Sequence, residues 1–146
     1  MLGRTYAGQD CSAARALEIV GERWSLLILR DAIFGHLTRF TELQRSLGVA
    51  PNILTSRLER FVEAGLMTQD GREYHLTTMG RELAPAIVAL TQWGDRWVET
   101  PDGPPIRYAH DGCGGTLEHT LVCDSCGKAA PPDDIAVEPL REPRVA

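Results

Sequence analysis

The sequence predicts a mainly α-helical fold with one small β-hairpin, followed by a small Cys/His-rich appendage. Three observations predict it. Residues 40–67, FTELQRSLGVAPNILTSRLERFVEAGLM, read as two short helices around a glycine turn. An Asp-Gly turn signal follows directly, between two short runs that contain β-forming residues. An HxxC pair and a CxxC pair then follow a Pro-rich stretch.

Composition sets the class of protein. The 146 residues are 43% hydrophobic, which is enough for a packed core. No apolar run approaches the roughly 20 residues that span a bilayer, and the first residues lack the apolar region of a secretory signal. We therefore expect a cytoplasmic protein, whose four cysteines are free thiols or metal ligands rather than disulfides.

The net charge of −5 is unevenly distributed. Residues 1–100 carry 11 arginines and 12 acidic residues, whereas residues 101–146 carry 4 basic and 8 acidic residues. The acidity therefore belongs to the tail. A near-neutral first part can still bind DNA if its arginines gather on one face, but it should bind non-specific DNA weakly.

We expect four segments along the chain. Residues 1–100 form one domain, and residues 101–109 a linker, because PDGPPIRYA holds three prolines and a glycine. Residues 110–130 form a possible zinc-binding ribbon, and residues 131–146 an acidic, Pro-rich tail.

Two helices should open the first domain. The first begins at Ser12, a suitable N-cap, and ends at Gly21. The second ends at Gly35. Its spacing predicts a buried face made of Trp24, Leu27, Ile28 and Phe34.

The next two helices resemble a DNA-reading pair. Thr41 and Gln44 fit a capping box at the start of the third helix, and Gly48 permits a sharp turn. Pro51 suits the first position of the fourth helix, which should run to about residue 64. Its apolar back consists of Leu54, Leu58 and Phe61. An apolar back with short polar residues on the front suits a major groove.

A wing and a long helix complete the domain. Asp70-Gly71 predicts a hairpin turn between residues 66–69 and 72–76, so that Arg72 lies at the tip. The last helix should run from about residue 78 to 99, capped by Thr77 or Thr78, with Pro85 bending it or shifting its start. Its apolar stripe predicts a dimer interface, with packing inside one chain as the alternative, and consists of Leu83, Ile87, Leu90, Trp93 and Trp97.

Taken together, these segments resemble a known family. IVGERWSLLILRDAIFG, RFTELQRSLGVAPNILTSRLERFVEAGLM and YHLTTMGREL follow one another, with Cys11 before them and a tryptophan after them. This pattern, over about residues 11–97, resembles the HxlR family of winged helix-turn-helix transcriptional regulators, which is akin to the MarR group. The resemblance implies a homodimer that reads a two-fold symmetric operator, with the first and last helices at the interface. One departure is Ala50, where family members often place a serine cap; it costs roughly 1 kcal/mol of capping.

The expected DNA contacts lie on the fourth helix and around the wing. Asn, Ser and Thr side chains can reach base edges, while arginines at the periphery contact phosphates or the minor groove. Arg57 has two readings, since it either faces DNA or pairs with Glu63 or another acid of the domain. The full candidate set is Arg39, Asn52, Thr55, Ser56, Arg57, Arg60 and Arg72.

Cys11 is a candidate redox sensor. The resemblance implies that role, because several family members sense oxidants or electrophiles with a cysteine at this place. The helix N-terminus and Arg15 would favour the thiolate. With no second cysteine in residues 1–100, oxidation needs a Cys11–Cys11 bridge between subunits or a mixed disulfide. The alternative is a small buried apolar residue.

The Cys/His segment predicts a structural zinc site. Its spacing, H-x2-C-x9-C-x2-C, supplies one histidine and three cysteines, a closed tetrahedral set. The expected ligands are His110, Cys113, Cys123 and Cys126. His119 or Asp111 could replace His110, and a redox CxxC at 123–126 or an inert remnant are the metal-free alternatives.

The sequence thus predicts a sequence-specific DNA-binding transcriptional regulator, a homodimeric repressor that responds to oxidants, electrophiles or a small ligand. Two other classes stay open: a winged-helix protein-interaction module that does not bind DNA, and a metal or redox sensor with the tail as its input. No catalytic constellation is present, so we do not expect an enzyme.

Overall fold

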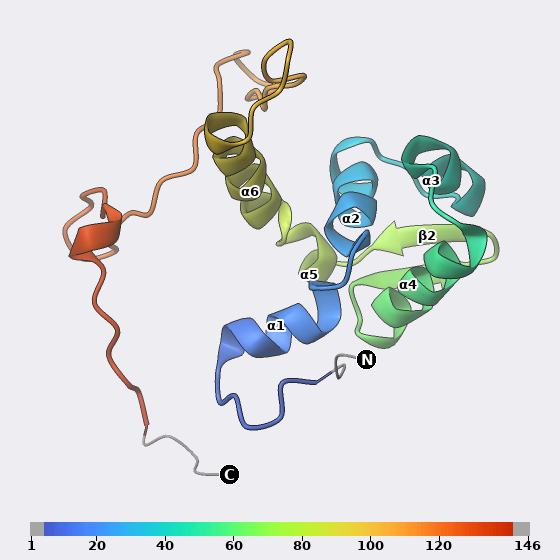
Figure 1. Cartoon of the computed structure of the whole chain (residues 1–146), viewed down its shortest axis with the longest axis horizontal. Coiled ribbons are helices and arrows are strands. Elements are labelled where there is room, and N and C mark those ends of the chain that lie inside the picture. Colours follow the sequence, from blue (N-terminus) through green and yellow to red (C-terminus); the bar gives the residue numbers. More distant parts are fainter. Residues whose placement is uncertain (1–4, 142–146) are drawn as a thin grey trace. The chain divides into compact units, whose positions relative to one another are not determined.

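Residues 5–141 are described here by a computed structural model, and they form two compact units, residues 5–84 and 85–141 (Figure 1). The last five residues of the predicted acidic tail, 142–146, lie outside the described residues. Within residues 5–141, no helix combines the length and apolar character needed to cross a membrane.

The first unit contains most of the regular structure. Its helices are α1 (Ser12–Val20), α2 (Ser25–Phe34), α3 (Phe40–Leu47), α4 (Pro51–Glu63) and α5 (Thr78–Arg81). Strands β1 (Met67–Asp70) and β2 (Glu73–Leu76) form an antiparallel hairpin with Met67 opposite Leu76. Helix α6 (Ala84–Trp97) begins at the junction of the units, and the second unit also holds η1 (Pro132–Asp134). The prediction of a mainly α-helical fold with a small hairpin is confirmed.

The core of the first unit lies between α2, α3, α4 and the start of the hairpin. Its largest fully buried apolar side chains are Ile28, Leu29, Leu43, Leu54, Leu58, Phe61, Leu66 and Met67. A polar link joins α2 to α3, because Ser46 Oγ donates to Asp31 Oδ2 at 2.6 Å and Asp31 is only 8% exposed. Apolar burial therefore holds α4 in place, and the outer face of α4 does not contribute to the core.

The predicted ends of the first two helices at Gly21 and Gly35 are confirmed, whereas the predicted N-cap of the first helix is wrong. Cys11, not Ser12, is the N-cap of α1, since its carbonyl accepts the N–H of Arg15. Helix α2 begins after Trp24, whose φ of 80° is left-handed. Its buried stripe follows an i, i+3, i+4, i+7 pattern and consists of Ser25, Ile28, Leu29 and Ala32.

Because the stripe of α2 starts at Ser25, the predicted buried face is mostly not buried. Leu27 is 41% exposed and Phe34 is 38% exposed, and only Ile28 of the four predicted residues lies fully inside. Trp24 is half-buried in the loop before the helix, with the Arg23 guanidinium 5.7 Å from its ring centre. Because Trp24 has a positive φ and precedes the helix, it does not belong to the helix face that the sequence pattern assumed.

The cap of α3 is also different from the predicted one. The helix begins at Phe40, and the Glu42 carboxylate accepts the N–H of Arg39 at 3.1 Å, so Thr41 and Gln44 do not form the box. The hairpin causes this shift. The Tyr74 N–H donates to the Thr38 carbonyl at 2.7 Å, which holds the chain extended just before α3.

The last predicted helix is split. Thr77 caps α5, with its hydroxyl accepting the Gly80 N–H at 3.3 Å as expected. Helix α5 ends at Arg81, and α6 starts afresh at Ala84. Pro85 explains the break, because it lacks an N–H and its ring excludes the carbonyl four residues back.

Candidate nucleic-acid interface and Cys/His turns

Helices α3 and α4 form a helix-turn-helix whose turn is set by glycine. Gly48 has a φ of 62°, and its N–H closes α3 on the Gln44 carbonyl at 2.9 Å. Pro51 is the first residue of α4, and no side chain caps that helix at Ala50, as predicted. The predicted apolar back is confirmed, since Leu54, Leu58 and Phe61 are each 0% exposed.

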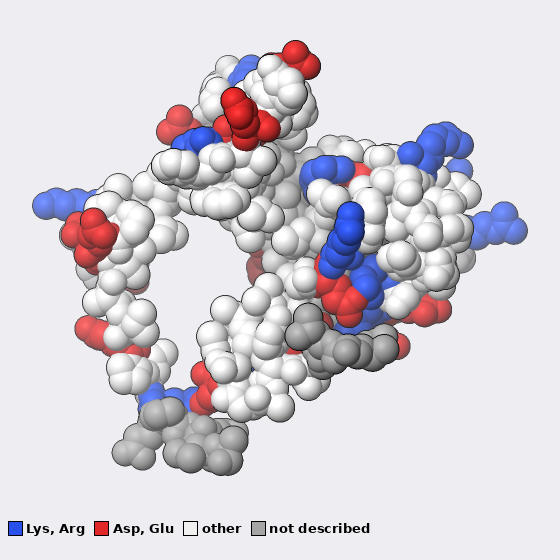
Figure 2. Space-filling model, in the orientation of Figure 1, with Lys and Arg blue, Asp and Glu red and all other residues white. Residues whose placement is uncertain are grey.

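With its back fixed, α4 presents a polar front. Asn52, Thr55 and Ser56 are all exposed, and so is Arg60, which lies 3.8 Å from Glu63 on the same helix. Figure 2 shows Arg side chains, in blue, projecting from the edge of this unit that α3 and the hairpin tip form in Figure 1. Short polar groups at the N-terminal half of a recognition helix are well suited to contact base edges.

Arg57 takes the second of its two predicted readings. Its guanidinium forms an ion pair with Glu22 of the α1–α2 loop, and its side chain is 18% exposed. The partner is therefore an acid of the same unit, although not Glu63. This pair ties the loop that follows α1 to the middle of α4.

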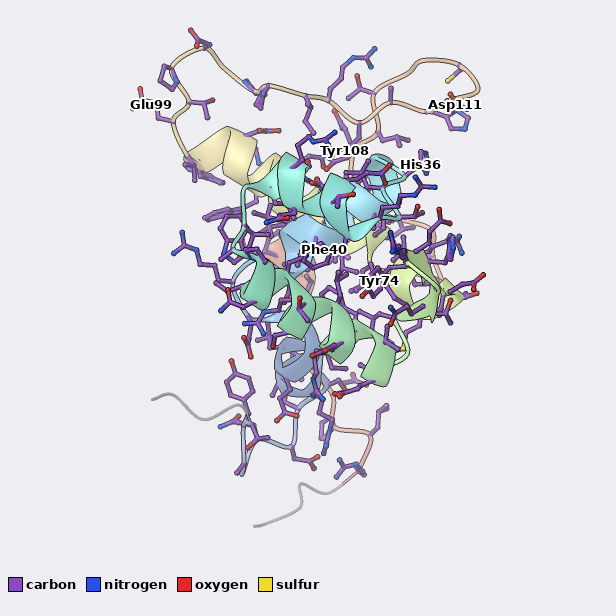
Figure 3. The ribbon with its side chains drawn as sticks, turned by 90° about the vertical axis from the view of Figure 1, so that its right-hand side faces the viewer. His36, Phe40, Tyr74, Glu99, Tyr108 and Asp111 are labelled. Carbon is purple, nitrogen blue, oxygen red and sulfur yellow. The ribbon has the colours of Figure 1, made fainter. Side chains whose placement is uncertain are left out.

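The hairpin is placed beside the start of α3 (Figure 3). Asp70 and Glu73 are paired strand residues, so the turn consists of Gly71 and Arg72 rather than Asp70 and Gly71. Gly71 has a φ of 57°, which suits glycine at the first position of such a turn. Arg72 lies exposed at the tip, as expected.

An open hollow of ≈ 730 Å³ separates the hairpin from α3, and Arg39, Phe40, Arg72 and Tyr74 contribute to its lining. Figure 3 labels Phe40 and Tyr74. Arg39 Nε donates to Glu73 Oε1 at 3.0 Å, yet the Arg39 side chain remains 62% exposed. One of the two cations at this hollow is thus partly neutralised by a neighbour.

The sequence reasoning left out the outer face of α3. Arg45 is exposed there and, with Thr41 and Gln44, lines a second hollow of ≈ 490 Å³ beside Gly48. The helical period would have revealed it, because Leu43 is buried and these polar residues lie away from it. The first helix of such a motif crosses the DNA backbone.

Cys11 lies exposed as a free thiol at the start of α1. The predicted alternative of a buried apolar residue is therefore wrong. The Arg15 guanidinium lies 3.6 Å from the Asp10 carboxylate, so part of its charge is balanced by that acid.

The predicted interface stripe on α6 is only partly covered. Ile87 is 4% exposed and Leu83 is half-buried. Leu90, Trp93 and Trp97 are 51%, 53% and 74% exposed. Large apolar side chains at i, i+3 and i+7 on an exposed helix form the kind of surface on which interaction sites are found.

The Cys/His segment consists of two turns in the second unit, which we call the first turn (residues 108–117) and the second turn (residues 121–130). The predicted ligands come in pairs, His110 and Cys113 in the first turn, Cys123 and Cys126 in the second. All four are exposed. Within residues 5–141, no three His, Cys, Asp or Glu side chains gather into one metal-binding group.

The second turn surrounds a sulfur with backbone donors. The N–H groups of Cys126 and Ser125, followed by the Cys126 side chain, hold the pKa of the Cys123 thiol below its usual value. Backbone N–H groups that bond the charged form favour it. The arrangement can therefore hold a thiolate.

The comparisons with known proteins extend over most of the chain. Residues 19–102 match the model of the HxlR-like helix-turn-helix family. The chain belongs to this family. The uncharacterised HTH-type transcriptional regulator Rv3095 of Mycobacterium tuberculosis is 45% identical over 145 residues, covering 94% of this chain and 90% of its own length. Mb3122 of Mycobacterium bovis matches equally well.

Solved structures agree with this assignment. PA1607, a candidate transcription factor, has a TM-score of 0.79 and 39% identity, covering 88% of this chain and 94% of its own. PA1374 from Pseudomonas aeruginosa has a TM-score of 0.62 and 35% identity, covering 90% and 95%. The redox regulator HypR in its oxidised form shares the fold at 23% identity, with a TM-score of 0.54 and coverage of 62% and 100%. This HxlR-like chain is thus a transcriptional regulator of the winged-helix type.

Proposed function

We propose that this HxlR-like protein is a homodimeric repressor that binds a two-fold symmetric operator through α4 and the hairpin. The observation that carries the proposal is the polar front of α4, held outward by three fully buried apolar residues on its back. A dimer that covers its operator blocks other proteins from the same DNA. Two copies of one recognition helix then read two half-sites about one helical turn apart.

Each candidate residue has a distinct role in this proposal. Asn52, Thr55 and Ser56 contact base edges in the major groove and give specificity. The exposed arginines at the periphery contact phosphates and fix the register without reading sequence. These are Arg39, Arg45, Arg60 and Arg72.

The exposed apolar face of α6 supports the homodimer. Trp93 and Trp97 are more than half exposed in the single chain, and large aromatic side chains are typical of interface centres. Leu17 on α1 is also 46% exposed, which agrees with an interface that uses the first and last helices. The occupant we propose is a second copy of this chain.

Oxidation of Cys11 is the proposed input. Two Cys11 thiols, one from each subunit, form a disulfide while an oxidant of the peroxide or quinone class takes up two electrons and two protons. Helix α1 leads into the loop whose Glu22 pairs with Arg57 of α4. A displacement of α1 would therefore reach the recognition helix and change the spacing of the two readers.

Fluorescence anisotropy tests the DNA binding. Reduced protein is titrated into labelled DNA from its own upstream region and into a scrambled control, across a salt series. We expect tighter binding to the upstream DNA and weakening with salt. The Asn52→Ala variant should lose about 1–3 kcal/mol of preference between the two DNAs.

Two variants that each remove one positive charge distinguish a lost DNA contact at the hairpin tip from a general change in net charge. Arg72→Ala should weaken binding to both DNAs and reduce the salt slope by about 1. Lys128→Ala removes the same charge from the second turn and should change neither. If the protein binds all DNA fragments of the whole genome equally weakly, the proposal is overturned in favour of a protein-interaction module.

Oligomeric state and oxidation have their own measurements. Light scattering should give twice the chain mass for the wild type, and Trp97→Ala should shift the measured mass toward that of the monomer.

A peroxide or quinone should lower the operator affinity of the wild type but not of Cys11→Ser. If Cys11→Ser responds like the wild type, Cys11 is not the input.

A further inference from the structure

The two Cys/His turns repeat one another at an offset of 13 residues. The bridge Ala109↔Thr116 in the first turn corresponds to Val122↔Ala129 in the second. The bond from the His110 N–H to the Gly115 carbonyl, 2.8 Å, corresponds to that from Cys123 to Lys128, 2.9 Å. The same offset relates the bonds that close each turn onto residue 110 and residue 123.

The glycines of the two turns repeat in the same way. Gly114 has a φ of 71° and Gly127 a φ of 69°. Each follows the second candidate ligand of its turn and permits a left-handed residue there. The shared backbone places residues 110 and 113 of the first turn like residues 123 and 126 of the second. The two sequences, HDGCG and CDSCG, share the Asp, the Cys at the fourth position and the final Gly, and they adopt one ligand-presenting turn.

The first turn already has the spacing of two ligands on one ion. His110 Nδ1 lies 3.3 Å from Cys113 Sγ. Tetrahedral Zn²⁺ with Zn–N of 2.0–2.1 Å and Zn–S of 2.3 Å puts such a pair about 3.6 Å apart. A movement of a few tenths of an ångström would therefore let both atoms bind the same ion.

The structure also discriminates between the candidate histidines. His119 lies between the turns, and both its backbone N–H and its Nδ1 contact Gln92 Oε1 of α6 at 3.1 Å. Its ring is thus engaged with α6, whereas the His110 ring faces a cysteine sulfur. His110 is therefore the better fourth ligand.

Beyond these hydrogen bonds, little apolar packing stabilises the turns. Leu117, Leu121 and Val122 beside them are 42%, 59% and 61% exposed, so almost no apolar burial supports this segment. Small units of this kind are held by a metal or by disulfides, and metal binding supplies their folding energy. Closing one turn on the other would also cover these apolar side chains.

We propose that the two turns close on one zinc ion per chain, bound by His110 Nδ1 and the thiolates of Cys113, Cys123 and Cys126. Each cysteine releases one proton on binding, and the imidazole binds as the neutral base. Four protein ligands leave no position for water, so the site is structural. Residues 114–122 connect the two pairs and are long enough to form a closed loop between them.

Metal analysis of the full chain tests this site. The reduced protein is loaded with Zn²⁺, freed of excess metal and measured by elemental analysis, and Co²⁺ replaces zinc to report geometry by its visible spectrum. We expect about one zinc per chain at every protein concentration, with the intense bands of tetrahedral cobalt and sulfur-to-cobalt charge transfer.

Matched variants assign the ligands. His110→Ala and Cys126→Ser should weaken zinc binding more than 100-fold, since even outer-shell changes cost 10- to 100-fold. His119→Ala and Cys11→Ser should bind zinc like the wild type. An unchanged far-UV circular dichroism spectrum in all four variants shows that the first unit is folded, so these results are independent of the proposed DNA function.

Three outcomes would overturn the proposal: no zinc retained by the wild type, equal loss in His119→Ala and His110→Ala, or one zinc per two chains. The last result would place the two turns of different chains on a shared ion.

Discussion

The first unit and the two Cys/His turns are stabilised by different physical means. In the first unit, α2, α3 and α4 bury a continuous set of apolar side chains, and the residues that we propose to contact DNA lie on the outside of this core. In residues 108–130, nearly every residue is exposed, and backbone hydrogen bonds around two glycines define the turns. The comparison teaches that one chain can combine a domain held by apolar packing with a segment held by backbone hydrogen bonds around Cys and His residues.

The largest expected effect is in the core of the first unit. Leu58→Ala should destabilise the protein by about 2–5 kcal/mol, because Leu58 is fully buried on the back of α4. The same deletion at Leu121, which is 59% exposed beside the second turn, should cost less than about 0.5 kcal/mol in metal-free protein. Urea denaturation followed by far-UV circular dichroism measures both. Similar losses in the two variants would contradict the contrast between packing and turns.

The next effect depends on close backbone approach. A Cβ at Gly80 would lie 2.3 Å from the Leu66 carbonyl oxygen and 2.9 Å from Leu76 Cδ2. Gly80→Ala should therefore force α5 away from the hairpin and cost about 1–3 kcal/mol. Thr78→Ala, at an exposed position of the same helix, is the control and should lie within about 0.5 kcal/mol of the wild type. A harmless Gly80→Ala would mean that α5 is not held against Leu66.

The polar link between α2 and α3 gives a smaller effect. Ser46→Ala removes the 2.6 Å hydrogen bond to the nearly buried Asp31 carboxylate. Because Asp31 keeps its ion pair with Arg30, we expect a loss of about 1–2 kcal/mol. The same substitution at Ser56, exposed on α4, should change stability by less than about 0.5 kcal/mol. Equal values for the two variants would show that the link to Asp31 contributes nothing.

What could be predicted from the sequence follows the same division. The buried back of α4 was readable because Leu54, Leu58 and Phe61 follow an undisturbed helical period. The face of α2 was misread because the left-handed Trp24 precedes the helix and the buried stripe includes Ser25 and Ala32 instead of Leu27 and Phe34. That conformation depends on the surrounding structure, and no pattern of apolar residues encodes it.

Non-local contacts account for the other differences in the candidate site. The hairpin, thirty-odd residues downstream, holds Thr38 extended and moves the cap of α3. The pair of Arg57 with Glu22 joins residues far apart in the sequence, so the two readings of Arg57 could not be separated beforehand. The Cys/His spacing revealed candidate ligands, but only the hydrogen bonds showed that the two turns repeat one another.

The smallest expected effect on stability concerns Glu73, which lies between the hairpin and α3. It accepts a hydrogen bond from Arg39 at 3.0 Å, but both side chains are more than a third exposed, so Glu73→Gln should change stability by no more than about 0.5 kcal/mol.

The effect of Glu73→Gln on DNA affinity should be larger than its effect on stability. Removing the carboxylate releases Arg39 for a phosphate and removes a like charge from the DNA, so affinity should rise and the salt slope steepen. Arg39→Ala should do the opposite, and the double variant should resemble Arg39→Ala if Glu73 acts through Arg39. If Glu73→Gln raises affinity equally in the presence and absence of Arg39, the acid repels DNA directly and the pair does not regulate the contact.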